Sequence, residues 1–111
     1  MVYEKSMLLE AIGDTLQNRV IDFLIEGRGI DYSKKDIADS CDISRPTIHK
    51  ILPELLVNGF VVSKRSIGRI VLYQLNEENE KVKALLKLEE FLLQKSFEII
   101  ESKVPLVMGV H

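Results

Sequence analysis

The pattern of apolar and polar positions between residues 33 and 58 predicts two short helices joined by a tight turn. In the first helix, apolar residues at spacings i, i+1 and i+4 make one apolar face: Ile37, Ala38 and Cys41. In the second, the apolar residues recur at spacings typical of a helix that is buried along one side: Ile48, Ile51, Leu52, Leu55 and Leu56. Ser33 and Ser44 are the expected N-caps, and Asp36 completes a capping box at the first of them. Two helices that cross over a short turn form a helix-turn-helix, whose second helix enters the major groove of DNA.

The second helix contains two prolines. Pro46 lies in the first turn, where a backbone N–H has no intrahelical partner, so it costs little. Pro53 lies in the middle, where it removes the hydrogen bond to the carbonyl of His49 at a cost of roughly 3 kcal/mol. The helix is therefore either kinked or broken at Pro53. We expect a kink, because the apolar spacing continues unchanged through the proline.

A β-hairpin is predicted directly after this helix. Gly59 ends the helix, since a residue without Cβ adopts the left-handed conformation cheaply. Residues 60–66 and 69–75 are rich in β-branched and aromatic side chains, and they flank a turn at Ile67-Gly68. In the first strand, alternation predicts one face with Phe60, Val62 and Lys64 and another with Val61, Ser63 and Arg65.

A helix-turn-helix followed at once by a hairpin resembles the winged helix-turn-helix family, in particular the compact bacterial and archaeal regulators of the MarR, ArsR and TrmB type. The resemblance covers roughly residues 15–75, and its most specific parts are residues 44–55 and the run Asn58-Gly59-Phe60-Val61. It implies a mainly α fold with a small β-hairpin wing (α+β) and a transcriptional regulator that binds double-stranded DNA. Winged helices also serve as protein-binding modules, so an assembly module in transcription or partition machinery is the alternative.

Further elements are expected before the helix-turn-helix. A helix should run from Asp14 or Thr15 to Glu26, with Leu16, Val20, Phe23 and Leu24 on one side and Gly27-Arg28-Gly29 at its end. Residues 1–12 are compatible with a short helix or with a segment that leads into one, and Gly13 favours a bend. Residues 30–32 are where winged helices often place a minimal third strand.

A long helix is predicted from Asn76, its expected N-cap, to about Ser102. The helix is apolar around most of its circumference. One small domain cannot cover that much apolar surface, so we expect the helix to pack against a second copy of itself in a homodimer. The candidate interface residues are Leu85, Leu88, Phe91, Leu92, Phe97 and Ile99. The chain thus divides into a DNA-binding part, residues 1–75, and a C-terminal dimerisation helix and tail, residues 76–111, within one compact unit. The tail, residues 104–111, either packs at that interface or is loose.

The charge is unevenly distributed along the chain. The formal net charge is -2, which alone argues weakly against DNA binding. Residues 1–43 carry a net charge of -4, residues 44–74 a net charge of +4, and residues 75–111 a net charge of -2. The basic block coincides with the second helix of the motif and the hairpin, the two elements that this type of fold presents to DNA.

The DNA-binding candidates follow from these elements: Ser44, Arg45, Pro46, Thr47, His49, Lys50, Lys64, Arg65 and Arg69. Arg45 and Lys50 can bind guanine, Thr47 can place its methyl group against thymine, and Ser44 can touch a phosphate besides capping the helix. For His49, contact with DNA and an ordinary position on a solvated helix face are equally expected. The hairpin cations either follow the phosphate backbone or enter the minor groove, or they only protect a sheet edge from aggregation.

Composition narrows the class of protein. The single cysteine excludes an internal disulfide and suits a reducing cytoplasm, and no apolar run approaches the ~20 residues of a membrane span. Cys41 is either an oxidant sensor, which needs exposure and a depressed pKa, or a small hydrophobic residue of the core, and we favour the second. No metal-ligand spacing, phosphate loop or nucleophile–base motif is present, so we expect no metal, no cofactor and no enzymatic activity. The sequence identifies no small-molecule effector.

Overall fold

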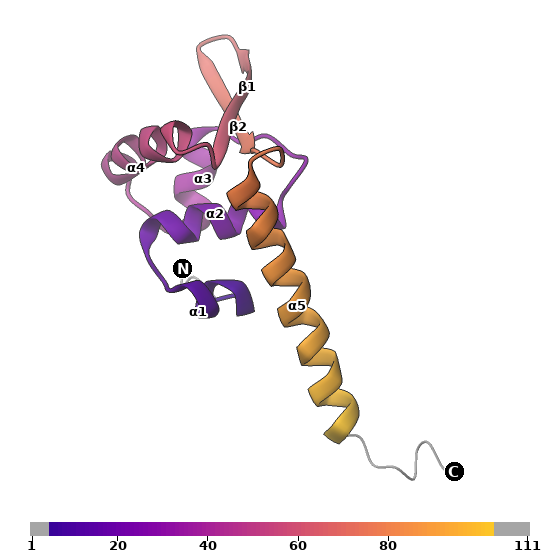
Figure 1. The fold of residues 1–111 in the computed structure, drawn as a ribbon. Helices are drawn as coiled ribbons and strands as arrows, with labels where there is room; N and C mark the ends of the chain where they lie inside the picture. Colours follow the sequence, from indigo (N-terminus) through magenta and orange to yellow (C-terminus); the bar gives the residue numbers. More distant parts are fainter. Residues whose placement is uncertain (1–4, 104–111) are drawn as a thin grey trace.

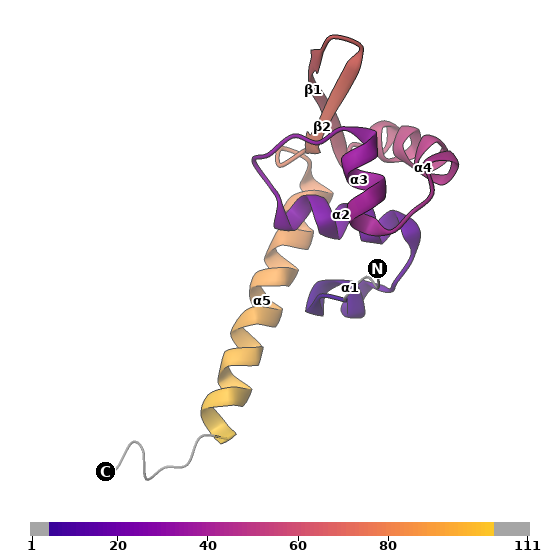
Figure 2. The ribbon, with the colours of Figure 1, turned by 180° about the vertical axis from the view of Figure 1, so that it is seen from behind.

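The computed structural model of the protein describes residues 5–103, with side chains as far as residue 100. The elements in chain order are α1 (Met7–Ile12), α2 (Leu16–Glu26), α3 (Lys34–Cys41), α4 (Arg45–Val57), β1 (Val61–Ile67), β2 (Ile70–Leu75) and α5 (Glu80–Lys103). Helices α1 to α4 form the body, and the β1–β2 hairpin and the far half of α5 extend from it in opposite directions (Figures 1 and 2). The expected mainly α fold with a small hairpin wing is confirmed.

Helices α3 and α4 form the predicted helix-turn-helix. The Ser33 hydroxyl accepts a hydrogen bond from the Asp36 N–H at 3.1 Å, and the Asp36 carboxylate accepts one from the Ser33 N–H at 3.2 Å, so the capping box is complete. The turn between the helices places Asp42 in the left-handed region, with φ 56°, which aspartate tolerates better than most residues. Ile43 then enters the core, and Ser44 caps α4.

Helix α4 is continuous through Pro53, so the alternative of two separate pieces is excluded. It ends at Val57, and Gly59 follows with φ 83°, the left-handed conformation expected of a glycine after a helix. A Cβ at this position would meet the side-chain amide nitrogen of Asn79, which would have to shift, so the positive φ is the main reason for glycine here.

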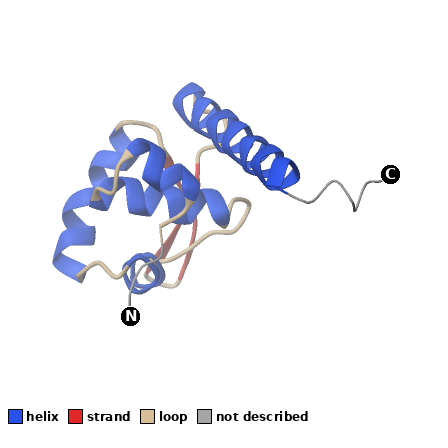
Figure 3. Cartoon of the chain, turned by 90° about the horizontal axis from the view of Figure 1, so that it is seen from below, coloured by secondary structure: helices blue, strands red, loops and turns tan. Residues whose placement is uncertain are grey.

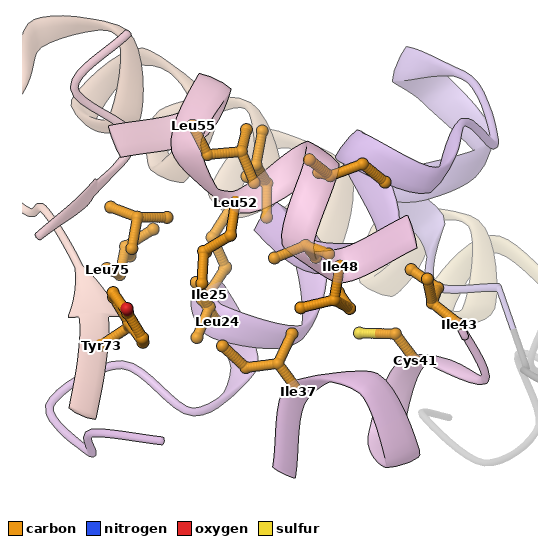
Figure 4. Close-up of a cluster of buried hydrophobic side chains, with 14 of the residues drawn as sticks. Leu24, Ile25, Ile37, Cys41, Ile43, Ile48, Leu52, Leu55, Tyr73 and Leu75 are labelled. Carbon is orange, nitrogen blue, oxygen red and sulfur yellow. The ribbon is translucent and has the colours of Figure 1, made fainter. Parts of the chain in front are cut away.

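The core lies between α2, α3, α4 and the base of the wing (Figure 4). Leu24 and Ile25 come from α2, Ile37 and Cys41 from α3, and Ile48, Leu52 and Leu55 from α4, while Tyr73 and Leu75 close the cluster from β2. Burying each large apolar side chain contributes roughly 1.5–3 kcal/mol, so this cluster holds the orientation of α4. Leu16 departs from the expected apolar face of α2: it is 40% exposed, because the helix buries Ile21 and Ile25 instead.

The wing is an antiparallel pair whose turn lies one residue later than predicted, at Gly68-Arg69, so that Ile67 belongs to β1 and pairs with Ile70. The predicted alternation also fails beyond Ser63. Ser63 pairs with Tyr73 and Arg65 pairs with Leu72, so Lys64 is the extra residue of a β-bulge. The minimal third strand is confirmed as a bridge in which Tyr32 and Tyr73 exchange backbone hydrogen bonds of 2.8 and 2.7 Å.

Helix α5 begins later than predicted, and its cap is Asn79 rather than Asn76. The Asn79 side-chain oxygen accepts from the Lys81 and Val82 N–H groups at 2.8 and 3.3 Å. Asn76 instead holds the turn after β2, since its oxygen accepts from the Glu78 N–H and its amide donates to the Gly59 carbonyl at 3.0 Å. Glu80 lies in the first turn of α5, where the helix macrodipole favours negative charge.

The first half of α5 packs against the core of the body. Val82 is fully buried, and four leucines are partly buried against the core: Leu85, Leu86, Leu88 and Leu92. From below, α5 lies to one side of the other helices (Figure 3). Among residues 5–103, no helix combines the length and apolarity needed to cross a bilayer. The two predicted alternatives for the tail, packing at the dimer interface or a loose end, concern residues 104–111, which lie outside the described residues.

Candidate nucleic-acid interface

The start of α4 presents most of the predicted DNA-binding side chains to solvent. Arg45, Pro46, His49 and Lys50 are exposed. Thr47 is half-buried, and its hydroxyl lies 2.8 Å from the hydroxyl of Ser44, which also accepts the Thr47 N–H at 3.4 Å. The two hydroxyls are thus occupied with each other at the helix start, while the charged side chains beside them point outward.

A cleft of about 350 Å³ separates the start of α3 and the exposed side of α4 from the wing. Its cationic and titratable lining residues are Lys34, Lys35, Arg45, His49 and Arg69, and its apolar lining residues are Ile70, Val71 and Tyr73. The structure therefore brings three predicted residues from α4 and the wing to one cleft: Arg45, His49 and Arg69. Lys50 and Lys64 are exposed but do not line it. Positive charge on two walls of one cleft favours an anionic ligand.

Two lysines of this cleft, Lys34 and Lys35, were missed by the sequence interpretation because they lie in the acidic segment 1–43. They are the first two residues of α3, where the helix macrodipole disfavours positive charge. The signal that could have found them is their position directly after the cap Ser33, since the first helix of such a motif crosses the DNA backbone.

His49 connects the two helices of the motif. Its Nδ1 lies 3.2 Å from the ammonium group of Lys34, which has only hydrogens to offer, so this nitrogen accepts the hydrogen bond. Lys35 in turn forms an ion pair with Asp39 on the same helix at 2.9 Å. The Lys34–His49 contact links α3 to α4 at the cleft, and the exposed Lys35–Asp39 pair offsets part of the charge of Lys35.

The three cations of the wing, Lys64, Arg65 and Arg69, occupy different environments. The Arg65 guanidinium binds the carboxylate of Asp31, with Nε 2.8 Å from the nearer oxygen. The hydrogen bond from Arg65 lowers the pKa of Asp31 below its ordinary value and raises the pKa of Arg65. Lys64 stands at the exposed bulge, and Arg69 lies in the turn. Arg69 is therefore the wing arginine best placed to meet a ligand of the cleft.

The predicted dimer residues also fall into two groups. Leu85, Leu88 and Leu92 pack partly against the core of their own chain, so they have less surface to offer a partner. The other predicted residues are more than half exposed: Phe91, Phe97 and Ile99. Leu93 and Ile100, which were not among the candidates, are exposed as well.

Cys41 has the environment of a core residue rather than of a sensor. It is fully buried, its thiol points to the Arg19 carbonyl at 3.6 Å, and burial raises its pKa to about 12. Within residues 5–103, no group of histidine, cysteine and carboxylate side chains is arranged to hold a metal ion.

No known family and no curated protein matches the chain by sequence. Solved structures do match its fold. A variant of MepR from Staphylococcus aureus bound to an oligodeoxyribonucleotide aligns with a TM-score of 0.63 over 92% of this chain and 74% of MepR, at 14% identity. MepR is a transcription regulator of the multidrug efflux pump MepA.

Two other regulators show the same similarity. NadR in complex with 4-hydroxyphenylacetate aligns with a TM-score of 0.61 over 88% of this chain and 68% of NadR, at 25% identity. The zinc-responsive MarR family member ZitR from Lactococcus lactis aligns with a TM-score of 0.55 over 81% of this chain and 60% of ZitR, at 21% identity. The chain thus has the winged helix-turn-helix fold of MarR-type transcription regulators, as the resemblance in its sequence predicted.

Proposed function

We propose that the protein is a sequence-specific, double-stranded DNA-binding transcriptional regulator that acts as a homodimer and carries out no enzymatic reaction. Helix α4, with its flanking residues 44–58, enters the major groove, and the wing, residues 60–75, lies on the backbone or in the adjacent minor groove. The observation that carries the proposal is the cleft in which cations from α3, α4 and the wing converge: Lys34, Lys35, Arg45 and Arg69.

The chemistry of this surface suits a phosphate backbone beside a groove. Phosphate contacts from lysine and arginine supply affinity and register, while side chains at the start of α4 reach base edges. Arg45 and Lys50 can each donate to guanine, and both are exposed on the first turns of a helix whose opposite side is fixed in the core. Lys34 and Lys35 lie at the positive end of the α3 dipole, where positive charge is unfavourable. A bound anion would offset this electrostatic repulsion. The fold likeness to MepR, a regulator solved with an oligodeoxyribonucleotide, supports the same assignment.

The homodimer is supported by the far half of α5. This part of the helix extends beyond the body in both views of the fold (Figures 1 and 2). It carries the large exposed apolar side chains Phe97 and Ile99, and Phe91 at the middle of α5 is exposed as well. A second copy that packs α5 against α5 would remove this surface from water. The resulting twofold symmetry would present two copies of α4, which fits DNA half-sites about one helical turn apart.

Selection of bound duplexes from a random pool tests the proposal directly. We expect a symmetric consensus with two half-sites, and binding that weakens steeply as salt increases, because counterions are released from the DNA. A chain that shows no salt-sensitive binding to any duplex would overturn the proposal and favour the alternative, a winged-helix module for protein assembly.

A matched pair of variants locates the contact surface. The double variant Arg45→Ala, Lys50→Ala should lower duplex affinity at least tenfold and leave dimerisation intact, since a base-contacting pair contributes roughly 1–3 kcal/mol. The control, Lys83→Ala with Lys87→Ala, removes the same charge from an exposed face of α5. If both variants lose affinity equally, the effect is one of net charge, and α4 is not the reading helix.

A further inference from the structure

The tip of the wing carries two large apolar side chains in a place where a solvated hairpin usually has polar ones. Ile67 is 58% exposed and Ile70 is 55% exposed, and the strand register pairs them directly across the turn Gly68-Arg69. Side chains that face each other in this way have Cβ atoms about 4.5–5.5 Å apart, so the pair forms one apolar knob. Gly68 has φ 62°, the positive value that a tight two-residue turn requires, so the knob ends the hairpin without a wider loop.

The surroundings of this knob are cationic. Arg69 lies in the turn itself, and Lys64 is exposed at the bulge in β1, three residues before Ile67. Arg45 lines the same cleft as Ile70 and Arg69. The wing tip is also the end of the hairpin farthest from the body (Figures 1 and 2). An apolar tip that is flanked by arginine and lysine matches a partner that combines dense negative charge with apolar edges. Duplex DNA is such a partner, because its minor groove places sugar and base edges between two rows of phosphates.

We propose that Ile67 and Ile70 act as a wedge that enters the minor groove beside the site read by α4 and partly unstacks one base step. This inference rests on the proposed function and deepens it. Arg69 anchors the tip to phosphates or to the groove wall, and the isoleucine pair meets the base edges between them. The wing thereby contributes to sequence preference through deformation, since pyrimidine–purine steps such as TA and CA open more easily than stiff A-tracts.

The experiment uses the full chain and the duplex obtained by selection, with 2-aminopurine, a base that fluoresces when unstacked, placed at the step beneath the wing. The test variant is Ile67→Thr with Ile70→Thr, which keeps β-branched side chains and hence the hairpin. The control is Leu16→Thr with Ile30→Thr, which makes the same kind of change at two exposed apolar positions outside α4 and the wing.

We expect wild-type protein and control to raise the fluorescence and to prefer a TA or CA step over an A-tract at that position. The wedge variant should lose the fluorescence rise. Its preference for a TA or CA step over an A-tract should fall about tenfold, a usual effect of changing one base pair, while the salt dependence of binding stays unchanged. The variant Arg69→Ala should instead reduce the salt slope by about one.

Binding by the wedge variant with the same fluorescence rise and step preference as wild type would overturn the inference and leave the proposed function standing. Loss of binding to a second protein, with DNA deformation unchanged, would also overturn it and assign the tip to that protein. If the wild-type chain binds no duplex at all, the proposed function fails and the wedge fails with it.

Discussion

The guanidinium of Arg65 on the wing is bound to the carboxylate of Asp31 in the loop before α3, with Nε 2.8 Å from one oxygen and Nη2 3.5 Å from the other. A two-point contact of this kind restricts orientation as well as supplying charge attraction. It therefore connects the wing to the segment that leads into the helix-turn-helix. It also offsets the positive charge of Arg65, which distinguishes this arginine from Arg69 in the turn.

Replacing Asp31 with Asn should raise the affinity for duplex DNA, because Arg65 would then be available to phosphates. We expect a gain of about threefold to tenfold and a salt slope that is steeper by about one. Because Arg65 is already paired with Asp31, the variant Arg65→Ala should lose less DNA affinity than the variant Arg69→Ala. Fluorescence anisotropy titrations at several salt concentrations measure both quantities.

The control for this prediction is Glu77→Gln, which removes one negative charge from an exposed position in the turn before α5. If Asp31→Asn and Glu77→Gln change the affinity equally, long-range charge explains the effect. If Asp31→Asn lowers the affinity, the ion pair orients the wing for binding, and the idea that it withholds Arg65 from DNA is wrong.

Cys41 should be chemically inert in the folded protein. Burial raises its pKa to about 12, so almost no thiolate exists at slightly alkaline pH, and the sulfur is fully enclosed by the core. We expect no reaction with a disulfide reagent in native conditions and stoichiometric reaction in denaturant. Cys41→Ala should retain DNA binding. Rapid labelling of the native protein, with a matching loss of DNA affinity, would instead show an oxidant sensor.

Glu26 should make the stability of the protein depend on pH. Desolvation, together with the nearby carboxylates of Asp22 and Glu89, raises the pKa of Glu26 above its ordinary value of 4.5. In the folded state this carboxyl group holds its proton more tightly than in the unfolded state. Its contribution to the free energy of unfolding is therefore present below pH 4.5 and is lost as the pH rises through the raised pKa.

Replacing Glu26 with Gln should remove that dependence and stabilise the protein at neutral pH, by an amount within about 0.5 kcal/mol because the site is near the surface. Urea unfolding at a series of pH values, at one fixed protein concentration, measures the effect. Glu77→Gln again serves as control and should reproduce the wild-type pH dependence. A neutral-pH stability that is lower in Glu26→Gln than in wild type would contradict the prediction.

The parts of the fold that could be predicted from sequence are those determined within a few residues. The caps Ser33 and Ser44 and the stop at Gly59 depend on side chains and φ angles that act over one helical turn, and all three are confirmed. The cap of α5 shows the limit of this reasoning. Asn76 and Asn79 have the same capping chemistry, and the choice between them depends on the Asn76 amide reaching the Gly59 carbonyl across the wing base.

The candidate interface could be predicted only where one element defines it. Arg45, His49 and Lys50 follow from the periodicity of α4 alone. The contribution of Lys34 to the cleft and the pairing of Arg65 with Asp31 depend on how separate elements pack, and Lys64 moved to a bulge because β1 has one residue more than its partner strand. These contacts depend on tertiary packing, which the hydrophobic pattern of the sequence does not specify.

A charge placed on the far half of α5 should separate the proposed dimer without unfolding the body. Phe97 is 65% exposed, and an aromatic side chain can bury roughly 150–250 Å² at an interface, so Phe97→Glu should raise the dimer dissociation constant at least tenfold. The matched control is Ala84→Glu, which adds the same charge to an exposed position near the start of α5. Sedimentation velocity measures the state of association, and circular dichroism checks the fold. Affinity should fall for a duplex with two half-sites and stay unchanged for a single half-site. A wild-type chain that sediments as a monomer at all concentrations would rule out the proposed dimer.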